Sequence, residues 1–325
     1  MASLRCAMPR TSEALYCILS FRLQKPIRKL DPFRSVPTAQ VLHRFCCGGA
    51  AVSVAKQGRL LTSQDLVALE YADLNLSGKN SESHIFKMWN QVVKVCFLQD
   101  LGHVRIRQHV NPLSASFSAP AQVPDWNKVY KDSTLPLMVD IGSGSGRFLM
   151  WLAKRNPHSM NYLGLDIRQK LVKRAEHWAK ELALSNIYFM FANATVSFKQ
   201  LVTMYPGPLM LVSILCPDPH FKKRHHKRRV LQEPLVKSII DNLSPGGQVF
   251  IQSDVLDVAV DMRNKFDGLC DEHELLQHID RVDSSIPCDE EGWLLGNPMG
   301  IRTEREIYAE FEGAKIYRRL YQKRT

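Results

Sequence analysis

The hydrophobic positions in the second half of the chain form five short apolar runs, separated by segments with helical periodicity. We expect a buried strand at each of 137–141, 162–165, 187–191, 209–215 and 248–252. The segments 147–155, 168–183, 196–204 and 231–242 between them are predicted helices. This alternation is typical of an α/β fold with a doubly wound, mostly parallel sheet. A further strand is predicted at 314–317, followed by the basic residues Arg318, Arg319, Lys323 and Arg324.

Upstream of these runs, the pattern predicts a helix and an extended arm. Residues 83–99 carry apolar side chains at helical spacing. Arg105, Arg107 and His109 alternate as on one side of an extended chain, and prolines follow at 112 and 120. We therefore predict three parts: a leader at 1–62, a helix and arm at 63–134, and the main domain at 135–325.

Composition narrows the class of protein. The 325 residues are 45% hydrophobic and 23% charged, which is ordinary for a globular protein and excludes a mostly disordered chain, a collagen or a coiled coil. The longest apolar run, 209–215, is far shorter than a bilayer span, so no transmembrane helix or membrane partner is expected. The net charge is +11, of which residues 1–62 contribute +8, so any basic patch in the main domain must be local.

The leader has the composition of an organelle transit peptide: it is rich in Arg, Ser and Thr and poor in acids, and it lacks the apolar core of a secretory signal. Its opening Met-Ala-Ser favours a chloroplast over a mitochondrion. The alternative is a basic arm that touches nucleic acid. Eight cysteines without a CxxC pair predict thiols in a reducing compartment and no metal site.

A glycine loop follows the first predicted strand. Gly142, Gly144 and Gly146 are spaced as GxGxG, and Asp166 ends the second strand 24 residues after Gly142. Glycines permit a sharp turn and close approach of a ligand, and an acid at that position can hold ribose hydroxyls. The interpretations are S-adenosylmethionine, NAD or a turn without a ligand. The tight spacing favours S-adenosylmethionine, because its single adenosine carries no pyrophosphate.

Two further strand ends carry candidate chemistry. Asn193 follows the third strand, where it either binds adenine or caps a helix. Asp218 follows the fourth strand between Pro217 and Pro219, which restrict the backbone on both sides of the carboxylate. Residues 222–229 then hold six Lys or Arg and two His, a density that suits a phosphate backbone. The alternative is a solvated charge run.

Acids near the C-terminus are candidates for recognition of guanine. Asp254 ends the fifth strand, and residues 303–306 read Thr-Glu-Arg-Glu. Carboxylates accept hydrogen bonds from the N1 and amino groups of guanine. From spacing alone, however, residues 303–306 are better interpreted as a helix N-cap with an acid at the third following position.

Together these residues resemble the tRNA (guanine-N7-)-methyltransferase family, of plant organellar type, over about residues 80–320. The resemblance rests on GSGSG, Asp166, Asn193-Ala194, PDPHFKKRHHKRR, Ser253-Asp254 and TERE, in this order. It implies a Rossmann-like class I S-adenosylmethionine-dependent methyltransferase fold. It also implies methylation of N7 of a guanosine in the tRNA variable loop.

The resemblance assigns roles to individual positions. Asp218 becomes the candidate catalytic residue, with a positioning and electrostatic role. Cofactor contacts are Gly142, Gly144, Asp166, Arg168, Asn193, Ala194 and Leu215. Substrate contacts are Lys222, Asp254, Thr303, Glu304, Arg305 and Glu306. The RNA backbone is assigned to Lys223, Arg224, Lys227, Arg228 and Arg229.

The sequence also departs from the family pattern. Asp140 and Asp166 stand where many bacterial members have Glu, and Cys216 and His220 replace aromatic residues beside Pro-Asp-Pro. Alternatives are a catalytically inactive RNA-binding module, an NAD-dependent oxidoreductase and a small-molecule methyltransferase. We expect tRNA as partner and no obligate protein partner, although some relatives use a β-propeller subunit. Monomer and homodimer both stay open.

Overall fold

The computed structural model describes residues 55–56, 59–76, 110–273 and 275–324, which fall into two compact units. Among the described residues, the smaller unit holds 55–56, 59–62 and 298–300, and in it β1 (Ala55–Lys56) pairs antiparallel with β2 (Arg59–Leu60). The larger unit holds the remaining elements. The predicted helix at 83–99 and the alternating residues Arg105, Arg107 and His109 lie outside the described residues.

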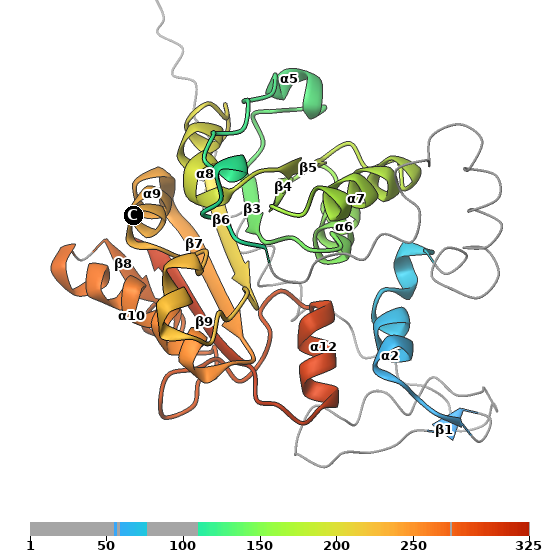
Figure 1. Ribbon diagram of the computed structural model, residues 1–325, viewed down its shortest axis with the longest axis vertical. Coiled ribbons are helices and arrows are strands. Elements are labelled where there is room, and N and C mark those ends of the chain that lie inside the picture. The colour runs from blue at the N-terminus through green and yellow to red at the C-terminus, as the bar shows by residue number, and fades with distance from the viewer. Residues whose placement is uncertain (1–54, 57–58, 77–109, 274, 325) are drawn as a thin grey trace, which may run out of the picture. The chain divides into compact units, whose positions relative to one another are not determined.

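The larger unit is built on a seven-stranded sheet in the order β5-β4-β3-β6-β7-β9-β8 (Figure 1). Five strands are parallel: β3 (Leu137–Ile141), β4 (Asn161–Asp166), β5 (Ile187–Phe191), β6 (Leu209–Leu215) and β7 (Leu243–Ser253). β9 (Tyr317–Lys323) pairs antiparallel with both β7 and β8 (Leu276–His278). The prediction of a doubly wound, mostly parallel sheet is confirmed.

The helices between the parallel strands lie where periodicity placed them. They are α6 (Arg147–Arg155), α7 (Gln169–Glu181), α8 (Ala194–Thr203) and α9 (Glu233–Asn242). Two segments nearer the C-terminus, the long α10 (Leu256–His273) and the shorter α12 (Glu304–Phe311), are also helical. The remaining short elements are α2 (Ser63–Glu70), η2 (Ala72–Leu74), η4 (Ala115–Phe117), α5 (Trp126–Val129), η5 (Lys223–Arg228) and α11 (Ile279–Val282).

Helices cover both faces of the sheet, because successive side chains of a strand point to opposite faces. Val139 and Ile141 of β3 share one buried cluster with apolar residues of α8, α9 and α10. Phe189 of β5 lies on the opposite face of the sheet, close to Gly146, which precedes α6, and to Ala175 of α7. None of the helices in the described ranges combines the length and apolarity that a bilayer span requires.

The last strand corrects one prediction. The expected strand at 314–317 with basic residues behind it is in fact β9, which starts at Tyr317 and contains Arg318, Arg319 and Lys323. Arg318 and Arg319 are buried, at 7% and 4% exposure. Each has partners that a local pattern does not reveal: Glu306 for Arg318, and His278 for Arg319. Two of the basic residues expected after the strand therefore lie buried and paired within it.

Candidate functional site

The strand order creates a topological switch point at the carboxyl edge of the sheet, and we call this region the crevice. β3 pairs with β4 on one side and with β6 on the other, so the chain reverses its direction of travel across the sheet between β3 and β6. In open α/β sheets, ligands bind outside the carboxyl ends of the strands at such a point. The glycine loop, Asp166, Asn193, Asp218 and Asp254 all follow the carboxyl ends of parallel strands. The topology therefore brings the residues predicted from scattered motifs to one edge.

The glycine loop turns through backbone conformations that favour glycine. Gly142, Gly144 and Gly146 have φ of +89°, +57° and +80°. A Cβ added at Gly146 would lie 2.6 Å from the ring of Phe189, so packing excludes a side chain there. A Cβ at Gly142 would meet nothing within 4 Å. The backbone at Gly142 thus faces open space, which is what close approach of a cofactor requires.

Asp166 ties the glycine loop to the end of β4. Its Oδ2 accepts a hydrogen bond from the Gly144 amide at 3.0 Å, and its two oxygens accept three more from the backbone and guanidinium of Arg168 at 2.7–2.9 Å. The carboxylate is 3% exposed. The contact of Asp166 with a ribose stays a prediction. Within the chain, its carboxylate oxygens already accept hydrogen bonds from Gly144 and Arg168.

Arg168 lies between two carboxylates of the crevice. Burial alone would lower the pKa of its guanidinium, but the hydrogen bonds that it donates to Asp166 and the charges of Asp166 and Asp218 hold that pKa above its ordinary value. The Asp218 carboxylate therefore acts electrostatically on a residue at the end of β4, although the two are 50 positions apart in the sequence. The crevice is a place where charges from separate strands interact.

Asp140 is a buried acid that the sequence marks only as a departure from the family pattern. It lies 4% exposed in the middle of β3, and Ser213 of β6 donates a hydrogen bond to its Oδ1 at 2.7 Å. Burial raises its pKa to about 7, against the opposing effect of the Ser213 hydrogen bond, and the nearby charge of Asp166 adds to the increase. An acid in the otherwise apolar run LMVDI was the signal that could have marked it as a candidate site residue.

Asn193 is the N-cap of α8, as one of its two interpretations expected. Its Oδ1 accepts from the Thr195 amide at 3.2 Å. Its Nδ2 donates to the carbonyls of Pro112 and Phe117, at 3.2 and 3.1 Å, so it holds the arm that precedes the domain. The Phe117 ring meets Phe191 edge to face at 6.0 Å between centroids. Contact of Asn193 with adenine stays a prediction, as do those of Ala194 and Leu215.

We call residues 216–229 the basic loop. It leaves β6 through Cys216 and continues to His220, and both have positive φ, at 48° and 43°. The two prolines and these two uncommon conformations restrict the backbone on either side of Asp218. Burial raises the pKa of the Cys216 thiol to about 12, so it stays protonated and unreactive. Asp218 itself is half-buried.

The basic loop divides its cations into two kinds. Lys222, Lys223, Arg224 and Lys227 are exposed, as a contact with phosphate requires, and Arg228 is half-buried. Arg229, which the resemblance assigned to the RNA backbone, lies inward, and its RNA contact stays a prediction. Its guanidinium is 5% exposed, donates to the Pro219 carbonyl at 3.0 Å, and pairs with Asp257 and with Asp261 of α10. Within the chain, it anchors the loop.

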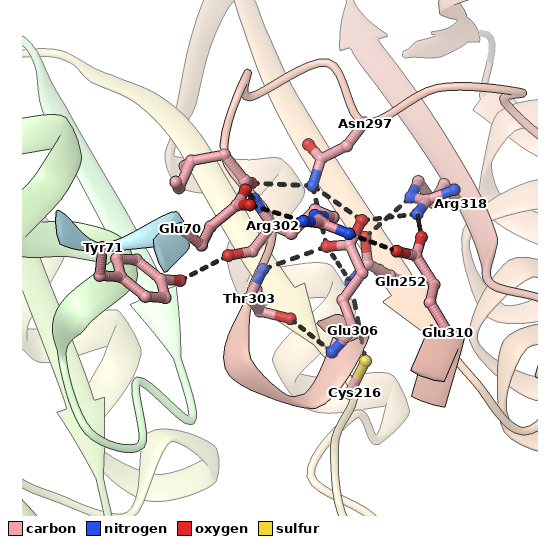
Figure 2. A network of polar contacts seen from close by, with 11 residues as sticks. Glu70, Tyr71, Cys216, Gln252, Asn297, Arg302, Thr303, Glu306, Glu310 and Arg318 are labelled. Atoms are coloured by element: carbon pink, nitrogen blue, oxygen red, sulfur yellow. Dashed lines mark hydrogen bonds and ion pairs between the residues drawn. The ribbon is translucent and has the colours of Figure 1, made fainter. Parts of the chain in front are cut away.

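Residues 303–306 form the first turn of α12 and its cap (Figure 2). The Thr303 hydroxyl accepts from the Glu306 amide, and the Glu306 carboxylate accepts from the Thr303 amide, both at 3.1 Å, which is a capping box. The capping interpretation is confirmed. Glu306 is 0% exposed and its carboxylate is held within the protein, so its predicted contact with the substrate stays a prediction.

The Glu306 carboxylate belongs to a buried polar network (Figure 2). Arg318 donates to it at 2.5 Å, Asn297 at 2.9 Å and Gln252 at 3.2 Å. Burial raises its pKa, and the Arg318 charge opposes that increase. The network continues through Arg302, which pairs with Glu70 of α2 at 2.6 Å and with Glu310 at 3.0 Å. It fixes α12 against β7, β9 and α2.

The other two charged residues of this turn, Glu304 and Arg305, contact residues that border the crevice. The Glu304 carboxylate accepts from the Ser145 hydroxyl and from the Arg147 guanidinium, each at 2.5 Å. Arg305 donates to Asp254 at 2.5 Å. The first turn of α12 thus holds the glycine loop on one side and the end of β7 on the other. Arg147 was missed, because only the fold shows that α12 lies beside the start of α6.

Comparisons with known proteins agree with this architecture. A family model described as "Putative methyltransferase" matches residues 134–318. A tRNA (guanine-N(7)-)-methyltransferase of Synechococcus sp. (strain JA-2-3B'a(2-13)) is 46% identical over 224 residues, 69% of this chain and 86% of that protein. One of Synechocystis sp. (strain ATCC 27184 / PCC 6803 / Kazusa) is 41% identical over 223 residues, 69% of this chain and 99% of that protein. The crystal structure of an rRNA methylase from Streptococcus thermophilus is 11% identical, with a TM-score of 0.37, over 61% of this chain and 91% of that one.

The fold and the family model define an S-adenosylmethionine-dependent methyltransferase of class I. Within that class, the chain belongs to the family of the tRNA (guanine-N(7)-)-methyltransferases. The residues fit the cofactor: the backbone at Gly142 faces open space, and the Asp166 carboxylate holds the glycine loop through the Gly144 amide.

Proposed function

We propose that the protein transfers the methyl group of S-adenosylmethionine to N7 of a guanosine in the variable loop of tRNA. The reaction class comes from the family, since relatives of 41–46% identity over 69% of the chain are named for it. The structural observation that carries the proposal is the position of Asp218. Asp218 follows the end of β6 beside the cofactor crevice, and the loop that contains it carries four exposed cations.

The chemistry requires little of the protein beyond alignment and charge. Guanine N7 has an in-plane lone pair and no proton, so no general base is needed. S-adenosylmethionine, when bound, supplies the methyl group, and Gly142, Gly144 and Asp166 are the residues that would hold it. Positive charge develops on the purine as the methyl group arrives. In this proposal Asp218 holds the base edge and stabilises that charge, a role that its electrostatic interaction with Arg168 supports.

Recognition of the RNA is assigned to the exposed cations. Lys222, Lys223, Arg224 and Lys227 provide the phosphate contacts, while Arg229 keeps the loop in place. Arg305, with a half-exposed side chain, is the member of the α12 turn best placed for the substrate. We propose Arg305 and Asp254 together as substrate contacts, because the Arg305 guanidinium and the Asp254 carboxylate contact each other.

The test is methyl transfer by the full chain. Labelled S-adenosylmethionine and unmodified tRNA are incubated with the protein and with D218N, and the labelled nucleotide is mapped. We expect label at guanine N7 in the variable loop, and little with D218N. Label at another atom or another loop would contradict the proposed site. Binding of tRNA without any incorporation would instead favour the inactive RNA-binding module, and binding of NAD would favour the oxidoreductase.

The leader supports a proposed location. We propose that residues 1–62 direct the protein to the chloroplast, with the mitochondrion as the alternative, because the segment carries ten basic and two acidic residues. We also propose that the protein acts without an obligate protein partner. A fluorescent protein fused to the C-terminus of the full chain would show the compartment. Methyl transfer by the purified chain alone would test whether it needs a partner.

A further inference from the structure

The ring of Phe221 is the most exposed large apolar side chain in the described part of the protein, at 74%. Single exposed apolar residues are common on protein surfaces and need no explanation by themselves. Phe221 differs from the others in its position. It lies three residues after Asp218 and directly before the four exposed cations of the basic loop.

The backbone on which Phe221 sits is anchored from the side of the protein core. Arg229 donates to the carbonyl of Pro219 at 3.0 Å and is itself buried between Asp257 and Asp261. Between Pro219 and Phe221, His220 takes a positive φ of 43° that few non-glycine residues adopt. Phe221 is therefore held outward by its backbone and not by a flexible loop.

The charges around the ring favour one class of ligand. Lys222, Lys223, Arg224 and Lys227 are exposed, and the Asp257 carboxylate, whose pKa is lowered first by Arg229, also feels the charge of Lys223. Cations that follow a phosphate backbone, combined with an aromatic ring on which a base can stack, are the two parts of a single-strand RNA platform. An acidic protein would satisfy the cations but would give the isolated ring no flat partner.

We propose that Phe221 is a stacking platform for an unpaired nucleobase of the RNA, within about two or three nucleotides of the methylated guanosine. This proposal rests on the proposed function, since Asp218 marks the reacting base. Three residues of chain span at most about 10 Å, and stacked bases are about 3.4 Å apart. The ring is thus positioned to hold the strand next to the target while the cations hold its phosphates.

The first experiment measures tRNA binding by the full chain, using fluorescence anisotropy at several salt concentrations, for F221A, F221L and F221Y. We expect F221A to bind roughly 5- to 100-fold more weakly. F221Y, which keeps a flat ring, should bind like the parent, and F221L should resemble F221A. The slope of log affinity against log salt should not change, because no cation is removed. An F221A variant within twofold of the parent, or an F221L variant that binds as well as F221Y, would overturn the proposal.

The second experiment locates the base. Abasic sites are introduced into the tRNA one at a time, at three positions on each side of the methylated guanosine. At the contacted position, F221A should cause no further loss of affinity, whereas it should cause its full loss at the others. If F221A weakens binding equally at all six positions, Phe221 does not stack on a neighbouring base.

Both experiments measure binding, so they separate this proposal from the proposed function. Failure of methyl transfer with an intact effect of F221A would contradict only the enzyme activity. Normal methyl transfer with no effect of F221A would contradict only the stacking role. The melting temperature serves as a control, because removal of an exposed ring should leave it unchanged.

Discussion

The glycine loop and the basic loop, which both border the crevice, differ in whether the cations beside them are paired with carboxylates or exposed at the surface. Beside the glycine loop, Arg147 and Arg168 fold back onto the carboxylates of Glu304 and Asp166. In the basic loop, the cations Lys222, Lys223, Arg224 and Lys227 are exposed at the surface. Charges paired inside the protein position its backbone, whereas charges left at the surface attract a polyanion. The comparison predicts that mutations in the first region change stability or cofactor binding, and mutations in the second change RNA binding.

The largest effect on stability should come from the network behind the glycine loop. Glu306→Ala leaves the buried Arg318 guanidinium without its closest carboxylate, and we expect about 3–5 kcal/mol of destabilisation in urea unfolding. Glu310→Ala is the matched control. Glu310 is also an Arg318 partner but is 34% exposed, so its loss should cost about 1 kcal/mol or less. Equal effects of the two variants would show that burial does not distinguish these ion pairs.

Asp218 tests the catalytic part of the basic loop. Asp218→Asn keeps the size of the side chain but removes its charge, and we expect kcat for methyl transfer to decrease about 10²- to 10³-fold. The Kd for tRNA should change little, because the exposed cations remain. Turnover that matches the parent would show that Asp218 does not stabilise the charge that develops on the base.

The acid beneath the glycine loop should make stability depend on pH. The pKa of Asp140 is raised from its ordinary 3.8 to about 7 in the folded protein, so the folded state binds the proton more tightly than the unfolded state. The resulting stability is fully present below about pH 4 and is lost as pH increases through about 7. Asp140→Asn should remove a dependence on the order of 2–4 kcal/mol between those limits. We would measure the free energy of unfolding in urea at pH 5 and pH 8 for the parent and for Asp140→Asn. Equal changes in both proteins between the two pH values would show that the pKa of Asp140 is not near 7.

The exposed cations should affect affinity and not stability. The triple variant Lys223→Ala, Arg224→Ala, Lys227→Ala should bind tRNA at least about tenfold more weakly near physiological salt. The slope of log affinity against log salt should decrease by about 2 to 3, since each phosphate contact contributes about 0.7–0.9. Arg229→Ala provides the contrast: it should lower the melting temperature, because it leaves two acids of the α10 region without their buried partner. A triple variant with an unchanged salt slope would contradict the division of the loop into two kinds of cation.

The smallest effect is expected at the link between α12 and the glycine loop. Glu304→Gln weakens the ion pair to Arg147 but keeps an acceptor for Ser145. We expect several-fold weaker binding of S-adenosylmethionine in calorimetry, corresponding to about 1 kcal/mol. Arg305→Gln, in the same turn but directed at Asp254, should leave cofactor binding unchanged. Weakened cofactor binding in both variants would indicate that the whole turn has moved.

Features that depend on neighbours along the chain were determined by the sequence itself. The prediction of α6 at 147–155 agrees with the structure to the residue, and four of the five predicted parallel strands agree closely. Apolar periodicity and glycine spacing are local quantities, and they decide which segments form strands, helices and turns. The same holds for the capping box at Thr303 and Glu306, whose two hydrogen bonds span only three residues.

Only the tertiary structure decided which charges lie inside. Arg229 reads as one more cation in a basic run, and Arg318 as part of a basic tail, yet each is buried against an acid far away in the sequence or on another element. Asn193 likewise uses its amide to hold residues 112 and 117 of the arm. Burial of a charge is favourable only where a partner and further hydrogen bonds compensate for lost water. Whether such a partner is present depends on which strands and helices meet, and that is a property of the folded chain.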